Sequence, residues 1–506
     1  MRKLIIPFFI VALLHSSSKG AISQIRWGST GDPLNGLNVT WTNTGTADSI
    51  KWGYTSSLES FRAPAVQRNG YASGRYFFTY IFPGSVKPNA VIYYTLYDSD
   101  SKSWGQQKTY STAPSSDTKS FTFLAIGDSR NGLSVWKKVS ELANTKKAAL
   151  TVFNGDVVDK GGSVSEWDDW FNSGAAYLEK NLVYHALGNH DEDNVDTKKF
   201  FENIFELPKN SNGSELYSAT KYGNVLFITL NSEVYGSYGD PKTQADWLAA
   251  ELQKAKKDPS ILWTVVSHHR PHLNIGEHNS QNSSFPGSWK PVMWKVYDDY
   301  GVDLVLNGHD HNYQRTKPVN LKVSSSAPVA KYGSEPGEGR CQIICGGAGA
   351  PLYPVNTSNA DAWAMEKYQS VDNFVLCEVN GCKMTITAYK ADGSVLDNFV
   401  LDKTGTSACK LSGDNNEISE AKVFNSIKII PNPTSGIFSL NFSSQDIGKG
   451  TVNIFDLSGN IVLTKNINKT EVNFTEQYDL SSFSKGIYNL QINVNGQTDN
   501  ALIIVK

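Results

Sequence analysis

Histidine, cysteine and methionine are scarce in this chain. Its 506 residues include nine His, five Cys and four Met. All five cysteines lie between Cys341 and Cys409, and no pair has the Cys-x-x-Cys spacing of a structural zinc site, which disfavours metal binding by thiolates. In an exported chain these cysteines could close up to two disulfides, and their pairing stays open.

No charge of one sign dominates the composition. Lys and Arg number 47 against 49 Asp and Glu, which gives a net charge of -2. Because nucleic-acid-binding domains are strongly basic, we expect no nucleic-acid partner. Hydrophobic residues make up 40% of the chain and aromatic residues 11%, so large cores can be buried. The length suggests about three to four domains.

Long hydrophobic runs are absent as well. The apolar stretch at residues 4–14 is too short for a bilayer span, which takes about 18 to 20 residues, and no later stretch is long enough. Arg2 and Lys3 precede this stretch and small polar residues follow it, which is typical of a secretory signal peptide over residues 1–20. A short membrane anchor is the alternative. We expect an exported protein without a transmembrane segment after signal removal.

The segment after the signal peptide consists of short strand-like runs separated by turns. Apolar and polar residues alternate around Trp41, Trp52, Phe78 and Tyr94, and Gly, Pro and Asn stand between the runs. This pattern predicts a β-sandwich over residues 21–115.

Short apolar runs then alternate with helical stretches, which predicts a layered α/β domain over residues 116–405. Each apolar run ends in Gly or Ser beside His, Asp or Asn, and strand ends are the usual place for a site in such a domain. The expected helices cover residues 134–147, 164–180, 242–256 and 288–300.

The last hundred residues differ again in composition. Residues 406–424 are polar and lack periodicity, which predicts a linker. Strand-like runs with frequent turns follow and predict a small β-sandwich over residues 425–506. The fold class expected for the whole chain is therefore multidomain α+β, with a central layered α/β sandwich between two β-sandwiches.

Five strand-end motifs of the central domain contain the residue types that bind hard metal ions. Carboxylates, imidazoles and an amide oxygen suit Fe, Mn or Zn. One carboxylate can bridge two cations about 3.5 to 4 Å apart, and such a pair can clamp a phosphoryl group. The motifs are GDSR with Asp128, GDVVD with Asp156, GNHD with Asn189, SHHRP with His269, and GHDH with His309 and His311.

These five motifs resemble the motif blocks of the calcineurin-like metallophosphoesterases. The first domain, with WG at 27–28, VTWT at 39–42 and STAP at 111–114, resembles the fibronectin-III-like domain of the purple acid phosphatase branch. The resemblance implies the metallophosphoesterase fold for the central domain. It covers residues 22–403.

The segments PNPTSG, DLSGN and DLSSFSKGIY near the C-terminus resemble the sorting domain of the type IX secretion system. A small carbohydrate-binding or adhesive sandwich is the alternative. The resemblance implies export through the periplasm, the type IX secretion machinery as a partner, and a secreted or cell-surface location.

The resemblance to the phosphoesterases also implies two divalent or trivalent metal ions, Fe, Zn or Mn. Asp156 would bridge them, and Asp128 and His311 would hold the first ion. His269 is preferred over the histidine before it because the family's ligand stands two residues before the proline, here Pro271. The implied metal ligands are Asp128, Asp156, Asn189, His269, His309 and His311.

Two further histidines match positions with a catalytic role in the family. His190 matches a residue that contacts the phosphate and helps the leaving group depart, which suits an imidazole because its pKa lies near working pH. His278, nine residues after His269, resembles a histidine used for substrate binding and protonation; chance placement on the surface is the alternative. The expected catalytic residues are His190, His278 and Asp156, and the expected substrate-binding residues are Arg130, His190 and His278.

Two positions depart from the family pattern. A tyrosine ligand stands three residues after the bridging aspartate in purple acid phosphatases, and here that residue is Asp159. Many other members have a histidine two residues after the first aspartate, and here it is Arg130. One hypothesis is that Arg130 and Asp159 pair, and another is that Arg130 reaches a substrate phosphate. The alternative is that both only solvate the rim of the site.

The expected function is therefore that of a secreted phosphatase. It would hydrolyse small phosphate monoesters by attack of a metal-bound hydroxide at a binuclear centre. A phosphodiesterase of the same superfamily is one alternative. A surface binding protein with an impaired metal site is the other.

Overall fold

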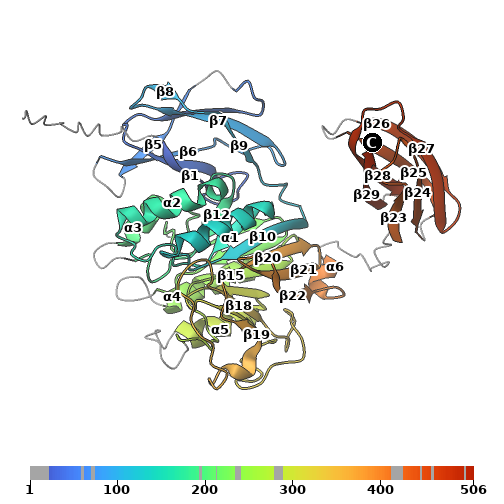
Figure 1. The fold of residues 1–506 in the computed structure, drawn as a ribbon. Coiled ribbons are helices and arrows are strands. Elements are labelled where there is room, and N and C mark those ends of the chain that lie inside the picture. The colour runs from blue at the N-terminus through green and yellow to red at the C-terminus, as the bar shows by residue number, and fades with distance from the viewer. Residues whose placement is uncertain are drawn as a thin grey trace, which may run out of the picture. The chain divides into compact units, whose positions relative to one another are not determined.

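The computed structural model separates the chain into two compact units, residues 1–415 and 416–506, and each is described by itself (Figure 1). The predicted signal peptide, residues 1–20, lies outside the described residues. The structure describes residues 22–58, 62–69, 74–192, 197–211, 213–233, 241–278, 289–411, 425–444, 447–456, 461–494 and 497–506.

A ten-stranded sheet runs through the first unit in the order β22-β21-β20-β10-β11-β12-β1-β2-β6-β5. Strands β10, β11 and β12 are parallel to one another, and β1 continues the sheet by pairing with β12 at Trp27 and Leu182. The strands are β1 (Ser23–Ser29), β2 (Leu37–Asn43), β5 (Val66–Asn69), β6 (Tyr76–Ile81), β10 (Ser120–Ile126), β11 (Leu150–Phe153), β12 (Leu182–His185), β20 (Asn373–Asn380), β21 (Lys383–Lys390) and β22 (Val395–Asp402).

The N-terminal strands form the expected β-sandwich. Strands β1, β2, β5 and β6 face a second sheet across an aromatic core, in which Trp27 stacks on Tyr110 with ring centroids 3.7 Å apart. Aromatic and β-branched side chains alternate along these strands, so one face of each sheet is apolar. The second sheet contains β3 (Ser49–Gly53), β4 (Ala63–Pro64), β7 (Val91–Asp98), β8 (Ser103–Trp104) and β9 (Lys108–Ser111).

A seven-stranded sheet, ordered β13-β14-β15-β16-β18-β17-β19, packs against the strands from β22 to β12 of the ten-stranded sheet. Phe123 and Phe227 meet across the shared core with ring centroids 5.0 Å apart. Strands β14, β15, β16 and β18 are parallel. The strands are β13 (Ser218–Tyr222), β14 (Val225–Thr229), β15 (Trp263–Ser267), β16 (Leu304–Asn307), β17 (Tyr313–Thr316), β18 (Cys341–Cys345) and β19 (Met365–Gln369).

Helices cover the outer faces of the two sheets, so the central domain has four layers (Figure 1). Trp136 of α1 stacks on Trp170 of α2 at 5.3 Å over one sheet, and Leu248 and Met293 anchor α4 and α5 on the other. No described helix is both long and apolar enough to cross a membrane. The helices are α1 (Leu133–Thr145), α2 (Val164–Leu178), α3 (Thr197–Ile204), α4 (Pro241–Ala255), α5 (Trp289–Tyr300), α6 (Ser407–Leu411) and the 3-10 helix η2 (Ala362–Ala364).

The four expected helices are confirmed as α1, α2, α4 and α5, each within two residues at either end. The short helix α6 falls within the segment expected as a linker, because a disulfide between Cys382 and Cys409 ties it to the β20–β21 hairpin. The rest of that segment, residues 412–424, lies outside the described residues. The other three cysteines are buried free thiols.

The second unit is a small β-sandwich. Its sheets, β23-β24-β27 and β26-β25-β28-β29, enclose a core that includes Leu440, Ile454 and Leu490. The fold class expected for the chain, multidomain α+β with β-sandwiches at both ends, is confirmed. The strands are β23 (Asn425–Ile430), β24 (Ile437–Ser443), β25 (Gly448–Phe455), β26 (Ile461–Lys469), β27 (Asn473–Asp479), β28 (Gly486–Val494) and β29 (Gln497–Val505).

Candidate metal centre

The five motifs converge where the carboxyl ends of strands from the two packed sheets lie together. Asp128, Asp156 and Asn189 follow the parallel strands β10, β11 and β12, whose carboxyl ends lie together. His269 and His309 follow β15 and β16, which are parallel strands of the other sheet. Each sheet therefore contributes part of the cluster from its strand ends.

The backbone at these strand ends has unusual geometry. Positive φ angles occur at Asp128 (60°), Arg130 (41°), Asp156 (52°) and His309 (70°). Such conformations are unfavourable for residues with a side chain and concentrate at functional sites. Gly308 is required for a different reason, because a Cβ there would collide with Oδ2 of Asp128.

Two buried carboxylates lie at the centre of the cluster. Asp128 is 0% exposed and Asp156 is 1% exposed. Oδ1 of Asp128 accepts a hydrogen bond of 2.9 Å from His309 N, whereas its Oδ2 has no hydrogen-bond partner in the described part of the chain. Ligand atoms of Asp128, Asp156 and His311 all lie within 4.8 Å of one another, the arrangement that a metal ion requires.

Hydrogen bonds orient the imidazoles toward these carboxylates. His311 Nδ1 lies 2.6 Å from the carbonyl of Pro351, which must accept its proton, so the lone pair of Nε2 points toward Asp128 Oδ1 at 3.7 Å. His269 Nδ1 donates in the same way to Asn154 O at 2.8 Å. A backbone carbonyl behind the imidazole is the usual support of a metal-binding histidine.

Nε2 of His269 faces a carboxylate oxygen and an amide oxygen. It lies 3.2 Å from Asp156 Oδ1 and 3.1 Å from Asn189 Oδ1. Burial opposes protonation of this imidazole, but the nearby carboxylates, Asp156 above all, outweigh burial and raise the pKa of His269 to about 10. The proton on Nε2 then balances the carboxylate charge where a cation would do so, and the donor set fits a metal ion.

The two carboxyls have opposite pKa shifts. Burial opposes the ionised form of both. At Asp156 the charge of His269 outweighs burial and holds the pKa of that carboxyl well below its ordinary value. At Asp128 burial dominates, and the pKa of that carboxyl lies well above its ordinary value. A bound cation favours the ionised form of both groups.

His309 lies beside His269 in the cluster. Arg270 and Glu233 support it, and neither residue was expected to have a role. Its Nδ1 lies 3.2 Å from His269 Nε2, and its Nε2 lies 3.2 Å from an Nη atom of Arg270. Arg270 is held by Glu233, which is fully buried and lies 2.8 Å away. Arg270 belongs to the SHHRP motif, so the motif contained the signal for this support.

Adjacent histidines of the SHHRP motif point to different places. His268 is buried away from the carboxylates, next to His272 and Trp289 with ring centroids 4.8 and 5.7 Å away. Burial lowers the pKa of His268 to about 3, so it is neutral. The structure therefore brings His269, and not His268, into the cluster.

Asp191 of the GNHD motif was not expected to have a role. Its Oδ1 accepts a hydrogen bond of 2.7 Å from Val157 N and its Oδ2 one of 2.9 Å from Gly188 N. This buried carboxylate therefore fixes the loops after β11 and β12 relative to each other. Burial, with Asp156 nearby, raises the pKa of Asp191 to about 7.

Arg130 and Asp159 form an ion pair, as the first hypothesis predicted. Arg130 Nε donates to Asp159 Oδ1 at 2.8 Å, and the guanidinium makes a second bond to the same oxygen. His190 Nδ1 lies 2.8 Å from the carbonyl of Asp159, which leaves its Nε2 available at the open side of the cluster. Glu166 of α2 fixes this loop, because its Oε2 accepts from Asp159 N at 2.9 Å.

His278 lies at the rim of the cluster. Its side chain is 37% exposed, and its ring centroid is 4.6 Å from that of His309. Its ring also lies 5.0 Å from the ring of Tyr353, which the sequence analysis missed. Tyr353 follows β18 in the segment GGAGAPLY, an apolar run ending in Gly like the five motifs but without a carboxylate or imidazole.

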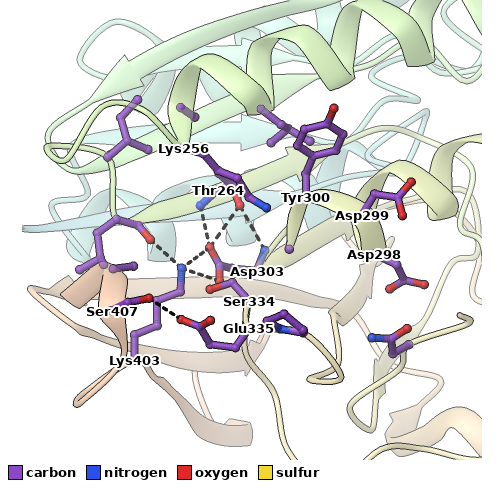
Figure 2. A pocket seen from close by; sticks show the side chains of 18 of the residues that line it. Lys256, Thr264, Asp298, Asp299, Tyr300, Asp303, Ser334, Glu335, Lys403 and Ser407 are labelled. Atoms are coloured by element: carbon purple, nitrogen blue, oxygen red, sulfur yellow. Dashed lines mark hydrogen bonds and ion pairs between the residues drawn. The ribbon is translucent and has the colours of Figure 1, made fainter. Parts of the chain in front are cut away.

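A cavity of about 760 Å³ opens at the opposite ends of the strands of the seven-stranded sheet, where β15 and β16 begin (Figure 2). Thr264 and Asp303 line it, and Lys403 is bonded to Asp303 within it. The five residue steps from Thr264 to His269 span about 16 Å along the strand direction. This cavity is therefore separate from the metal cluster.

Residues 121–313 match the family model of the calcineurin-like phosphoesterases. The match includes all five motifs. The chain therefore contains a calcineurin-like phosphoesterase domain. This family implies divalent or binuclear metal ions, and the buried carboxylates and imidazoles described above fit such ions. Residues 428–506 match the secretion system C-terminal sorting domain, which indicates a secreted or cell-surface protein.

The phosphoesterase domain has relatives among curated proteins. Purple acid phosphatase 18 of Arabidopsis thaliana is 26% identical over 320 residues, 60% of this chain and 68% of that protein. An uncharacterized protein of Mycobacterium tuberculosis is 29% identical over 188 residues, 33% of this chain and 34% of its own length. The match thus spans about a third of the mycobacterial relative.

A solved structure supports the same fold. The purple acid phosphatase isolated from yellow lupin (Lupinus luteus) seeds superposes with a TM-score of 0.63 at 18% sequence identity. The superposition covers 76% of this chain and 74% of that chain.

Proposed function

We propose that this protein is a secreted, metal-dependent phosphatase that hydrolyses small phosphate monoesters. The observation that carries the proposal is the convergence of Asp128, Asp156 and His311, whose ligand atoms lie within 4.8 Å in a buried cluster. The family match and the relatives named as purple acid phosphatases support the reaction class.

Six residues would hold two metal ions. Asp156 would be the ligand shared by both, because its carboxylate lies near His269 and also near Asp128 and His311. The bound ions supply positive charge for the phosphoryl oxygens and acidify water. The ligands are Asp128, Asp156, Asn189, His269, His309 and His311.

His190 and His278 serve the leaving group in the proposed reaction. The carbonyl of Asp159 accepts from His190 Nδ1, so this imidazole presents Nε2 to the substrate. His278 lies at the rim of the cluster beside His309. Either imidazole can give a proton to the departing alkoxide and stabilise the phosphate by a hydrogen bond.

The sorting domain supports a place outside the cell for this reaction. We propose that the type IX secretion machinery recognises the second unit after export through the periplasm. A phosphatase at the cell surface would meet phosphate esters from the surroundings. The net charge of -2 suggests that the local metal charge, and not the whole protein, attracts the substrate.

Replacing the bridging carboxylate tests the proposal. We expect Asp156→Asn to lower monoester hydrolysis by about 100- to 1000-fold, because the amide cannot neutralise two cations. Turnover of p-nitrophenyl phosphate and elemental analysis of the purified protein measure the two effects, and the metal content should fall below two ions. Asp246→Asn, at a side chain of α4 that is 67% exposed, is the matched control. Unchanged turnover in Asp156→Asn would refute the mechanism.

A further inference from the structure

Tyr353 is positioned by contacts to the same strand ends that form the metal centre. Its backbone N donates to His311 O at 3.0 Å, and its ring stacks on the His311 ring with centroids 4.1 Å apart and planes 15° apart. Ala350, three residues earlier, donates to Asp128 O at 2.8 Å. The loop after β18 is therefore fastened to both Asp128 and His311.

The side chain of Tyr353 lies beside the Arg130 guanidinium, which acts on its hydroxyl as a nearby charge and donor. Asp159 holds that guanidinium from its other side through Nε and one Nη atom. Arginine has only donors, so the O–H of Tyr353 finds no acceptor in this guanidinium and can donate to an oxygen of a bound substrate.

The Tyr353 ring stacks on the imidazole of His311, a proposed metal ligand, with ring centroids 4.1 Å apart. Tyr353 therefore lies beside both His311 and Arg130. An oxygen of a bound phosphoryl group would meet both donors there.

We propose that Tyr353 and Arg130 form a donor pair that recognises the terminal phosphoryl group of a monoester. This inference rests on the proposed function and names the residues that would set its preference for monoesters. A monoester has three non-bridging oxygens and carries two negative charges near neutral pH. A diester has two such oxygens and one charge, and its second ester oxygen is a weaker acceptor with a carbon substituent attached.

Charge and geometry support this assignment. Arg130 has five N–H donors in a planar group, and phosphate oxygens match that geometry. Asp159 accepts from two of its nitrogens and holds the plane in position. The pair is 14% and 19% exposed, so its contacts are partly shielded from water and the guanidinium cannot turn freely.

The test compares p-nitrophenyl phosphate with bis(p-nitrophenyl) phosphate as substrates of the metal-loaded full chain. We expect Tyr353→Phe to lower kcat/KM for the monoester by about 10- to 100-fold, the loss of a hydrogen bond to a charged group, mainly through KM. Diester turnover should change by less than about threefold, because no third charged oxygen is present. Phe preserves the stack on His311, so metal content and melting temperature should stay unchanged.

Tyr368→Phe, at a side chain on β19 that is 39% exposed, is the matched control and should behave like the parent protein. Equal losses on both substrates, or no loss on either, would overturn the proposal. Inorganic phosphate provides an independent measurement, since it should raise the melting temperature of the parent protein more than that of Tyr353→Phe. If the parent hydrolyses neither ester, the proposed function fails, and equal phosphate-induced shifts then overturn this inference separately.

Discussion

Arg130 carries its positive charge two residues from Asp128, beside the place where the family binds a cation. Asp159 neutralises that charge through two hydrogen bonds to one carboxylate oxygen. The two departures from the family pattern are therefore coupled, because the aspartate at the tyrosine position makes an arginine tolerable near the metal. A single substitution at either position would leave a partly buried charge unpaired.

His185 differs from the histidines of the metal centre because it is buried among aromatic rings. Its ring stacks on Phe205 at 3.9 Å, and burial, with Arg26 nearby, lowers the pKa of His185 to about 3. The unfolded chain binds a proton here below about pH 6.5, whereas the folded protein does not. Stability from this site is therefore complete above pH 6.5 and is lost as the pH falls toward 3.

We expect His185→Leu to flatten the pH dependence of the free energy of unfolding. The slope between pH 6.5 and 4 should fall by about 1.4 kcal/mol per pH unit, because one proton fewer is taken up on unfolding. Urea unfolding at several pH values measures the slope. Phe201→Leu, at a buried neighbour of His185, should lower stability equally at all pH values. A slope unchanged in His185→Leu would contradict the prediction.

At the scale of elements, the strand β22 and the start of β16 are joined by a buried ion pair (Figure 2). Lys403 Nζ lies 2.7 Å from a carboxylate oxygen of Asp303, and the side chains are 5% and 2% exposed. Lys403 also donates to the carbonyl of Leu262 at 2.6 Å. The pair therefore connects the edge of the ten-stranded sheet to the seven-stranded sheet.

Lys403→Met should destabilise the first unit by about 3 to 5 kcal/mol, because the substitution leaves Asp303 as a buried carboxylate without its cation. Thermal and urea unfolding measure the loss. Lys383→Met is the matched control on the same hairpin, since its ion pair with Asp402 is 45% exposed on both sides. The control should cost less than about 1 kcal/mol.

A double variant separates the ion pair from simple packing. Lys403→Met combined with Asp303→Leu removes both charges and should recover most of the stability lost in the single variant. Equal destabilisation of the single and double variants would mean that shape at this position matters and charge does not.

Local patterns predicted these elements well where they are regular. The helices α1, α2, α4 and α5 were recognisable from their own periodicity. Helix α6 was not predicted, because its five residues are held by a disulfide to Cys382 and not by helical periodicity. Tyr353 was missed for a similar reason, since its role depends on contacts to residues far away in the sequence.

At the scale of the whole molecule, the chain consists of two compact units with separate cores. The metal cluster lies entirely in the first unit, and the sorting domain in the second. Each core is closed by its own sheets, so neither unit needs the other for burial of apolar surface.

Removal of residues 416–506 should therefore leave the first unit folded. We expect the melting temperature of the truncated protein to match that of the full chain, because the core is intact. Its phosphatase activity should stay within about twofold of the full chain, because the cluster is intact. Export to the cell surface should be lost. Activity assays, calorimetry and cell fractionation measure these effects, with the full chain as control, and loss of hydrolysis in the truncated protein would contradict the prediction.

The sequence by itself determined the residue types and their order: carboxylates, imidazoles and an amide at five strand ends, and a sorting domain at the C-terminus. These features are visible without a structure because each motif is a short continuous stretch of sequence, which does not depend on how its strand packs. Only the tertiary structure decided which of two adjacent histidines faces the carboxylates, that Arg130 pairs with Asp159, and that Tyr353 stacks on His311. Side-chain direction and proximity depend on how the two sheets pack against each other, and no local pattern contains that information.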